Sequence, residues 1–153
     1  MSGAEADAHP VGEVVTREVT FDAADIADFA RRAGDANPLH HDPAYAARSR
    51  FGGIIASGTH YTALMMGLVA THFTSRRPSV GLGFEFIFRR AVPAGSTMRM
   101  SWEVARIEPS ARLGGDVLHL VGKMQDAATG RHMLEATARI LLLAEGTGIT
   151  GPA

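Results

Sequence analysis

The stretch GTHYTALMMGLVATHF, residues 58–73, decides the fold of this chain. It is the longest apolar segment, and we predict that it forms a helix. Its apolar side chains, among them Tyr61, Leu64, Met65 and Leu68, are spread around that helix and do not form a single stripe. A helix that is apolar nearly all round is typically buried. We therefore expect this helix to be covered by the other elements of the domain.

The segments that follow the helix predict the sheet that covers it. Stretches rich in Val, Phe, Leu and Met are separated by the turn sequences Pro-Ala-Gly, Gly-Gly and Thr-Gly. We predict strands at residues 11–20, 80–88, 97–107, 117–124 and 132–143. One strand, then helices, then four consecutive strands is typical of an antiparallel sheet with helices on one face. The sequence therefore predicts an α+β fold, with the sheet wrapped around the long helix.

Length and composition limit the domain organisation and the function. The chain has 153 residues, which suits one domain and not two, and we expect that domain at residues 11–144 with mobile tails at 1–10 and 145–153. The formal net charge of −1 argues against a nucleic-acid or anionic-membrane partner. The chain has no Cys, no secretion signal at its start and no run of ~20 apolar residues that would cross a bilayer. We expect a cytoplasmic protein.

The decapeptide GDANPLHHDP, residues 34–43, holds the side chains with the clearest chemistry. It follows a helix that we expect to begin after Asp22 and to stop at Gly34, and it leads into a short helix that begins at Asp42-Pro43. Pro38 pushes the preceding residue out of the α region, so Asp35 and His40 lie on a bend. A bend can aim both at one point, and a carboxylate with an imidazole can transfer protons near neutral pH. The alternative is that the acidic side chain only bonds the local backbone of a turn.

This decapeptide resembles the signature of the MaoC-like dehydratases, the (R)-specific enoyl-CoA hydratase family. The matching residues are Gly34, Asp35, Asn37, Pro38, Leu39, His40, Asp42 and Pro43. A second segment, GGIIASGTHYTAL at residues 52–64, resembles the family's loop into the central helix. The resemblance implies a hotdog fold, with Asp35 and His40 as the catalytic acid–base pair. It also places Gly58 where a backbone N–H faces the substrate carbonyl.

The resemblance implies a hydro-lyase that converts trans-2-enoyl thioesters reversibly to (R)-3-hydroxyacyl thioesters, carried by CoA or by an acyl carrier protein, without a cofactor. The backbone N–H near Gly58, at a helix start, would stabilise the negative charge that builds on the thioester oxygen. Two alternatives remain open: a hotdog thioesterase, and a non-catalytic subunit that binds acyl thioesters. The resemblance also implies a homodimer or a larger even assembly.

Five further residues are candidates for substrate binding: Asn37, Ser57, His60, Arg89 and Arg90. Each has a structural alternative. The Asn37 side chain could brace the bend, Ser57 could cap the long helix, and His60 could be a core histidine. The arginines could bind CoA phosphates or lie free on the surface. We expect no metal site, because His40, His41 and Asp42 are adjacent and point in different directions.

One strand raises a question about assembly. In GLGFEFIF, residues 81–88, the period-two alternation places Phe84, Phe86 and Phe88 on one face, with Leu82 in the same row. These side chains could all lie in the core, or part of the row could contact a second subunit. The sequence leaves both open.

Overall fold

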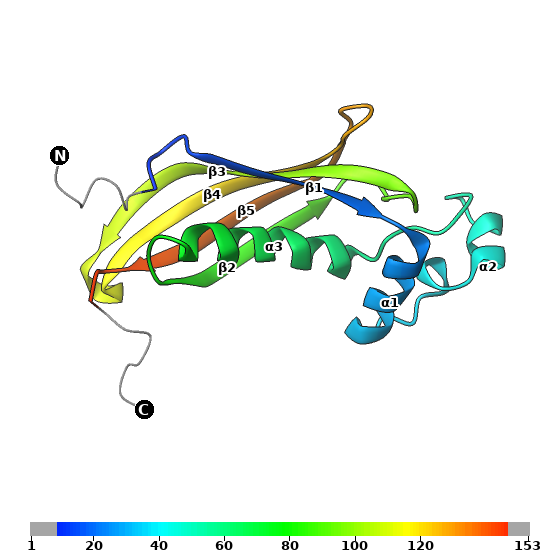
Figure 1. Cartoon of the computed structure of the whole chain (residues 1–153), viewed down its shortest axis with the longest axis horizontal. Coiled ribbons are helices and arrows are strands. Elements are labelled where there is room, and N and C mark those ends of the chain that lie inside the picture. Colours follow the sequence, from blue (N-terminus) through cyan, green and yellow to red (C-terminus); the bar gives the residue numbers. More distant parts are fainter. Residues whose placement is uncertain (1–8, 147–153) are drawn as a thin grey trace.

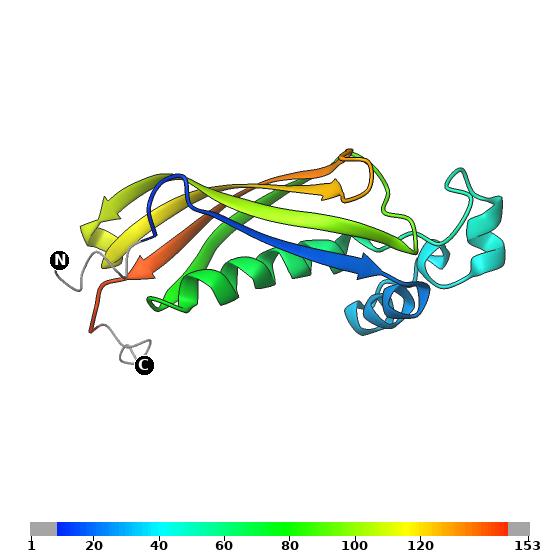
Figure 2. The same cartoon turned by 45° about the horizontal axis from the view of Figure 1, so that its top comes forward.

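The computed structural model describes residues 9–146 and consists of one antiparallel sheet with helices on one side and at one end (Figures 1 and 2). The sheet has five strands in the order β1-β3-β4-β5-β2. The long helix α3 lies along one face of it, while α1 and α2 lie beyond one end. The elements are β1 (Val14–Phe21), α1 (Ala23–Ala33), the 3-10 turn η1 (Pro38–His40), α2 (Pro43–Arg48), α3 (Gly58–Thr74), β2 (Ser79–Phe88), β3 (Ser96–Ser110), the 3-10 turn η2 (Ala111–Leu113), β4 (Gly115–Asp126) and β5 (His132–Leu143). This is the predicted α+β architecture.

The strand bounds differ from the prediction by three residues at two places and by at most two residues elsewhere. β1 begins at Val14 and not at residue 11, because Gly12 has a φ of 88° and forms a turn. β3 continues three residues past Ile107 through Pro109, which pairs with Asp116 near the end of the β3 and β4 ladder. The two strands therefore form a longer hairpin than the apolar pattern indicates.

The helix α3 is covered mainly on the side that faces the sheet. Tyr61, Met65, Val69 and Phe73 are buried against the sheet, at the i, i+4 spacing of one helical face. Met66, in contrast, is 42% exposed. The expectation that other elements cover this helix is confirmed for the face toward the sheet and for His60, which packs against α1. The face that carries Met66 is open in the single chain, because one five-stranded sheet covers one face of a helix.

Trp102 occupies the centre of the interface between the sheet and α3. It belongs to a row of paired residues that crosses all five strands: Val15, Trp102, Gly122, Ala136 and Phe86. Its indole N–H donates to the backbone oxygen of Met65 at 3.0 Å. A Cβ atom on Gly122 would lie 2.6 Å from the indole ring, so this glycine leaves the space that the ring fills.

The phenylalanine row of β2 is divided between the core and the surface. Phe84 and Phe86 stack on each other, with ring centroids 6.1 Å apart, and both contact Trp102 edge-on. Phe88 is 54% exposed and lies against the start of α3. A bulge between Gly81 and Gly83 inserts an extra residue, so the strand alternation that places Leu82 in the row does not continue past Phe84.

The segment before β1 contacts the C-terminal end of α3 through charged and imidazole side chains. His9 and His72 each lie 2.9 Å from a carboxylate oxygen of Glu13, and Arg76 lies 3.2 Å from the same group. Burial alone would raise the pKa of Glu13, but the hydrogen bonds from the two histidines outweigh it and lower that pKa. His9 is 1% exposed, so it packs as part of the domain, although it falls within the predicted N-terminal tail. The rest of the two predicted tails lies almost entirely outside the described residues.

Candidate active site

The bend between α1 and α2 is built by local hydrogen bonds that its sequence supplies. Asp22 accepts a hydrogen bond from the backbone N–H of Asp25 at the start of α1, and Gly34 ends that helix with a φ of 74°. The backbone N–H of Asp35 then donates to the Ala30 oxygen at 2.8 Å. These contacts confirm both predicted ends of α1 and fix the direction in which Asp35 leaves the helix.

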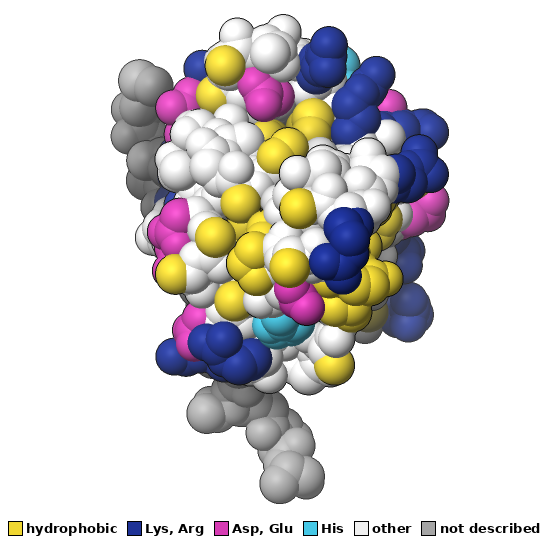
Figure 3. Space-filling model, turned by 90° about the vertical axis from the view of Figure 1, so that its right-hand side faces the viewer, with side chains coloured by type: hydrophobic (Ala, Val, Ile, Leu, Met, Phe, Trp, Pro, Cys, Tyr) yellow, Lys and Arg dark blue, Asp and Glu magenta, His cyan; other side chains and the backbone are white. Residues whose placement is uncertain are grey.

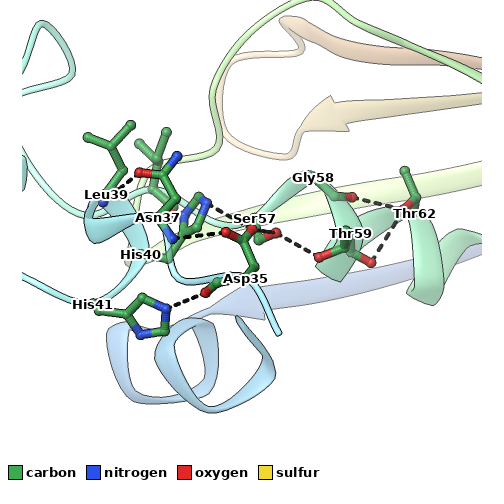
Figure 4. Close-up of polar contacts among 10 residues, drawn as sticks. Asp35, Asn37, Leu39, His40, His41, Ser57, Gly58, Thr59 and Thr62 are labelled. Atoms are coloured by element: carbon green, nitrogen blue, oxygen red, sulfur yellow. Dashed lines mark hydrogen bonds and ion pairs between the residues drawn. The ribbon is translucent and has the colours of Figure 1, made fainter. Parts of the chain in front are cut away.

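The Asp35 carboxylate is held at both of its oxygens. Oδ1 accepts the backbone N–H of Asn37 at 3.1 Å, and Oδ2 accepts the hydroxyl of Ser57 at 2.6 Å (Figure 4). The Ser57 hydroxyl is the main reason that the pKa of Asp35 lies below its ordinary value, with the Asn37 N–H as the next cause. The side chain is therefore ionised at neutral pH and acts as an acceptor.

His40 lies next to this carboxylate in a defined tautomer. Its Nδ1 is 2.7 Å from the backbone oxygen of Ile55. A carbonyl oxygen can only accept, so Nδ1 carries the hydrogen of the neutral ring and Nε2 carries the lone pair. That Nε2 lies 3.3 Å from Oδ2 of Asp35, and the imidazole is 6% exposed. The structure thus brings the two predicted residues together, with two acceptor atoms close enough to bind one water.

Ser57 precedes α3 but does not cap it through its side chain. Ser57 does occupy the N-cap position of α3, as expected, but its hydroxyl makes no bond to the backbone of the first turn and donates to Asp35 instead. Within residues 9–146, no group accepts a hydrogen bond from the backbone N–H of Gly58 or Thr59. Two donors at the positive end of the helix dipole are therefore available beside the acid–base pair.

Gly58 also has a packing reason to lack a side chain. A Cβ atom there would lie 3.0 Å from the ring of Phe88, which is tighter than nearly all such contacts. Phe88 and the neighbouring Tyr61 meet edge-on, with centroids 5.7 Å apart. The end of β2 is thereby placed against the start of α3.

The two histidines next to these residues have different surroundings. His41 Nε2 donates to the backbone oxygen of Asp35 at 2.6 Å, so it braces the bend. His60 packs against α1 and β1: its ring stacks on Phe29 at 4.3 Å and meets Phe21 edge-on at 5.1 Å. Burial lowers the pKa of His60, and its Nδ1 has no partner among the described residues. These contacts are those of a core histidine.

Asn37 and Asp42 bond the local backbone of the bend and of α2. The Asn37 side chain accepts the backbone N–H of Leu39 at 3.1 Å, which is the bracing role, and Asp42 similarly caps α2.

The two predicted arginines both have partners within the chain. Arg89 pairs with Glu135 at 2.8 Å, while Arg90 donates to the backbone oxygen of His132 at 2.8 Å. Both arginines are exposed and directly follow Phe88, which lies on the start of α3. Their contact with a ligand stays a prediction.

Thr59 is a site residue that sequence reasoning missed. Its hydroxyl lies 2.7 Å from that of Ser57, one step removed from Asp35. Only its place in the first turn of the long helix could have indicated it. Nothing in the local sequence signals that it bonds the residue before the helix.

Known proteins with similar sequences include two enzymes that act on CoA thioesters. A 3-hydroxybutyryl-CoA dehydratase from Methylorubrum extorquens is 34% identical over 103 residues, which are 65% of this chain and 62% of that protein. The match thus spans less than two thirds of that relative. An (R)-specific enoyl-CoA hydratase from Aeromonas caviae is 33% identical over 97 residues, which are 63% of this chain and 72% of that protein.

Solved structures agree. The (R)-hydratase from A. caviae involved in PHA biosynthesis has a TM-score of 0.77 at 27% identity, over 88% of this chain and 97% of that one. An unliganded R-hydratase from Pseudomonas aeruginosa has a TM-score of 0.77 at 26% identity, over 95% and 92%. The family model described as "MaoC like domain" matches residues 6–119. The chain belongs to this MaoC-like family and forms a single hotdog domain.

Proposed function

We propose that this protein is a hydro-lyase that adds water to trans-2-enoyl thioesters, giving (R)-3-hydroxyacyl thioesters, and catalyses the reverse dehydration. The observation that carries the proposal is the approach of His40 Nε2 to Asp35 Oδ2, at 3.3 Å, beside the unpaired N–H groups of the α3 start. The name of the A. caviae relative points to the same reaction and the same stereochemistry, and that of the M. extorquens relative points to the reverse dehydration.

The proposed reaction uses this pair on a single water. The water donates one hydrogen bond to Asp35 and the other to the lone pair of His40 Nε2. As its oxygen bonds to C3 of the enoyl group, His40 accepts its proton and the C2–C3 π electrons move toward the thioester oxygen. The imidazolium then returns a proton to C2, so that the overall change is addition of one water. Acid–base groups placed in this way typically contribute ~10²–10⁴ in rate.

The backbone donor of the proposed site is the N–H of Gly58. Negative charge builds on the thioester oxygen during the addition, and an N–H at a helix start favours such charge. Because the Ser57 side chain does not occupy these N–H groups, they stay open to a ligand. Removal of one such donor typically costs ~10²–10³ in rate.

A thioesterase is the main competing activity, since Asp35 alone could activate water against the thioester carbonyl. The tautomer of His40 favours hydration, because it presents a lone pair toward the same point as the carboxylate. The deciding test follows crotonyl-CoA by the ultraviolet absorbance of the conjugated thioester and by a thiol reagent in parallel. Hydration removes the absorbance without releasing thiol. Thiol release at the same rate would reject the proposal, and no change in either signal would favour a non-catalytic binding subunit.

The proposed substrate carries phosphates, which need positive charge at the entrance to the site. Figure 3 views the end of the molecule that carries α1 and α2 and shows Lys and Arg side chains along its margins, with hydrophobic side chains between them. We keep Arg89 and Arg90 as the proposed phosphate contacts, because they follow the strand end that lies on the start of α3. The carrier, CoA or acyl carrier protein, stays open. Among the described residues no helix is long and apolar enough to cross a membrane, and a cytoplasmic location stays a prediction.

We also propose that the working form contains two chains. The uncovered side of α3 adjoins the edge strand β2, and together they line a shallow cleft of about 290 Å³. Met66 on α3 is 42% exposed and Val80 on β2 is 40% exposed. An apolar helix face beside an unpaired strand edge is suited to pairing with a second copy.

A further inference from the structure

The hydroxyl of Ser57 donates to the bend and does not cap the backbone of its own helix. A serine at this position commonly accepts a hydrogen bond from the first turn of the helix that follows. Here it instead donates to Asp35, 22 residues earlier in the chain, at 2.6 Å. Ser57 is 1% exposed, so this contact is shielded from water. The start of α3 is thereby joined directly to the bend with the acid–base pair.

Thr59 adds a second step to this contact. Its Oγ1 lies 2.7 Å from the Ser57 Oγ (Figure 4). A serine hydroxyl has one hydrogen, and Ser57 gives it to Asp35, so Thr59 must be the donor in the second bond. The direction of donation is from Thr59 to Ser57 to Asp35. Hydrogen bonds in such a chain polarise one another, so the first strengthens the second.

We infer that Thr59 and Ser57 form a hydroxyl relay that positions the carboxylate of Asp35 for hydration, an inference that rests on the proposed function. The relay holds Oδ2 while the Asn37 N–H holds Oδ1, and together they set the rotation of the carboxylate toward His40. The relay also favours the ionised form of Asp35. Ser57 and Thr59 are positioning residues, because both act through Asp35.

The test compares four variants. Ser57→Ala removes the relay and Thr59→Val removes its first donor, whereas Thr59→Ser keeps a hydroxyl at an exposed position. Thr74→Val is the matched control, because it breaks a hydroxyl pair of the same length, 2.7 Å with Ser79, at the opposite end of the same helix. Each protein is labelled with ¹³C-aspartate, and the carboxyl signal of Asp35, assigned by its loss in Asp35→Asn, is titrated by NMR.

The titration midpoint of Asp35 is expected to move to higher pH in Ser57→Ala. A smaller move in the same direction is expected in Thr59→Val, and none in Thr59→Ser or Thr74→Val. With crotonyl-CoA, kcat should fall about tenfold or more in Ser57→Ala, the usual loss with a hydrogen bond to a charged group, while KM changes less than about twofold. An unchanged midpoint in both Ser57→Ala and Thr59→Val would overturn the relay, and Thr59→Val keeps this result available if Ser57→Ala does not fold.

The two arms separate the relay from the proposed function. The titration needs no substrate, so it reports on the relay even if no variant hydrates an enoyl thioester. Midpoints that follow the relay without any hydration would support the positioning of Asp35 and reject the hydro-lyase. Hydration with unmoved midpoints would support the hydro-lyase and reject the relay.

Discussion

The Nδ1 atom of His40 faces the backbone oxygen of Ile55 at 2.7 Å, and this contact decides which ring nitrogen is available for chemistry. Ile55 lies in the loop before α3, which also carries Ser57. The same short loop therefore orients both members of the proposed pair: its backbone oxygen sets the tautomer of His40, and its serine hydroxyl holds Asp35.

The first prediction concerns this pair. His40→Asn keeps an N–H donor for the Ile55 oxygen but has no base at the position of Nε2, and Asp35→Asn keeps the shape of the side chain without its charge. Each change is expected to lower kcat for crotonyl-CoA hydration by ~10²–10⁴. The absorbance assay measures the loss, and thermal melting confirms that the variants are folded. Near-normal turnover in either folded variant would refute the acid–base assignment.

The second prediction concerns the substrate phosphates. Replacing both Arg89 and Arg90 by Ala is expected to raise KM for crotonyl-CoA about tenfold with little change in kcat, because phosphate contacts hold the substrate away from the reacting atoms. KM for a crotonyl thioester of N-acetylcysteamine, which has no phosphate, should not change. Arg106→Ala is a suitable control, since that residue forms a comparable exposed ion pair, with Glu108 at 3.0 Å. Equal effects on both substrates would contradict the proposed contact.

Signals within a few residues predicted much of this structure. The caps at Asp22 and Asp42 and the stop at Gly34 all depend on side chains and φ values next to the helix ends, and all three are present. The meeting of Asp35 and His40 follows from a bend of six residues. Such features are local, so the sequence contains the information for them.

Contacts between distant segments were not predictable in the same way. The Ser57 hydroxyl could cap its own helix or bond a residue 22 positions away, and only the packing of the bend against α3 decides between them. The bulge next to Gly81 depends on the register with β5. The apolar pattern of α3 predicts burial, but it does not report whether the same chain covers both sides of the helix.

The third prediction tests the assembly. Met66→Glu and Val80→Lys each place a charge in the proposed contact between two chains, and both are expected to shift the protein from two chains toward one. Light scattering measures this shift against the chain mass of 16.2 kDa. Val121→Lys is the control, because Val121 is 53% exposed on the central strand β4, which β5 separates from β2, and it does not line the cleft between β2 and α3. A wild-type protein that is active as a single chain would contradict the proposed dimer.

The fourth prediction concerns the core. Gly122→Ala would place a Cβ atom 2.6 Å from the Trp102 ring, and that ring is fixed by its bond to the Met65 oxygen. Overpacking of this kind typically costs about 1–3 kcal/mol. Gly83→Ala, on β2, has no atom within 4 Å of the added Cβ and should be nearly neutral. Urea denaturation of both variants measures the difference, and equal stabilities would show that the indole can move aside.

The fifth prediction concerns the pH dependence of stability. Burial lowers the pKa of His60 in the folded chain, so the unfolded chain binds a proton more readily, and the contribution of His60 to stability is lost as pH falls below about 6.5. His60→Phe keeps a ring for stacking on Phe29 and removes the titrating group. Compared with wild type, this variant should lose less stability between pH 8 and pH 5.5 in thermal melts.

The control for that experiment is His132→Gln, which changes an exposed histidine on β5 and should leave the wild-type pH dependence in place. The same His60→Phe protein also tests whether His60 binds substrate. Because its ring packs against Phe29 and Phe21, KM and kcat for crotonyl-CoA are expected to stay within about threefold of wild type. A large rise in KM with unchanged stability would restore His60 to the substrate pocket. If His60→Phe lost as much stability as wild type between pH 8 and pH 5.5, protonation of His60 would not be the cause of that loss.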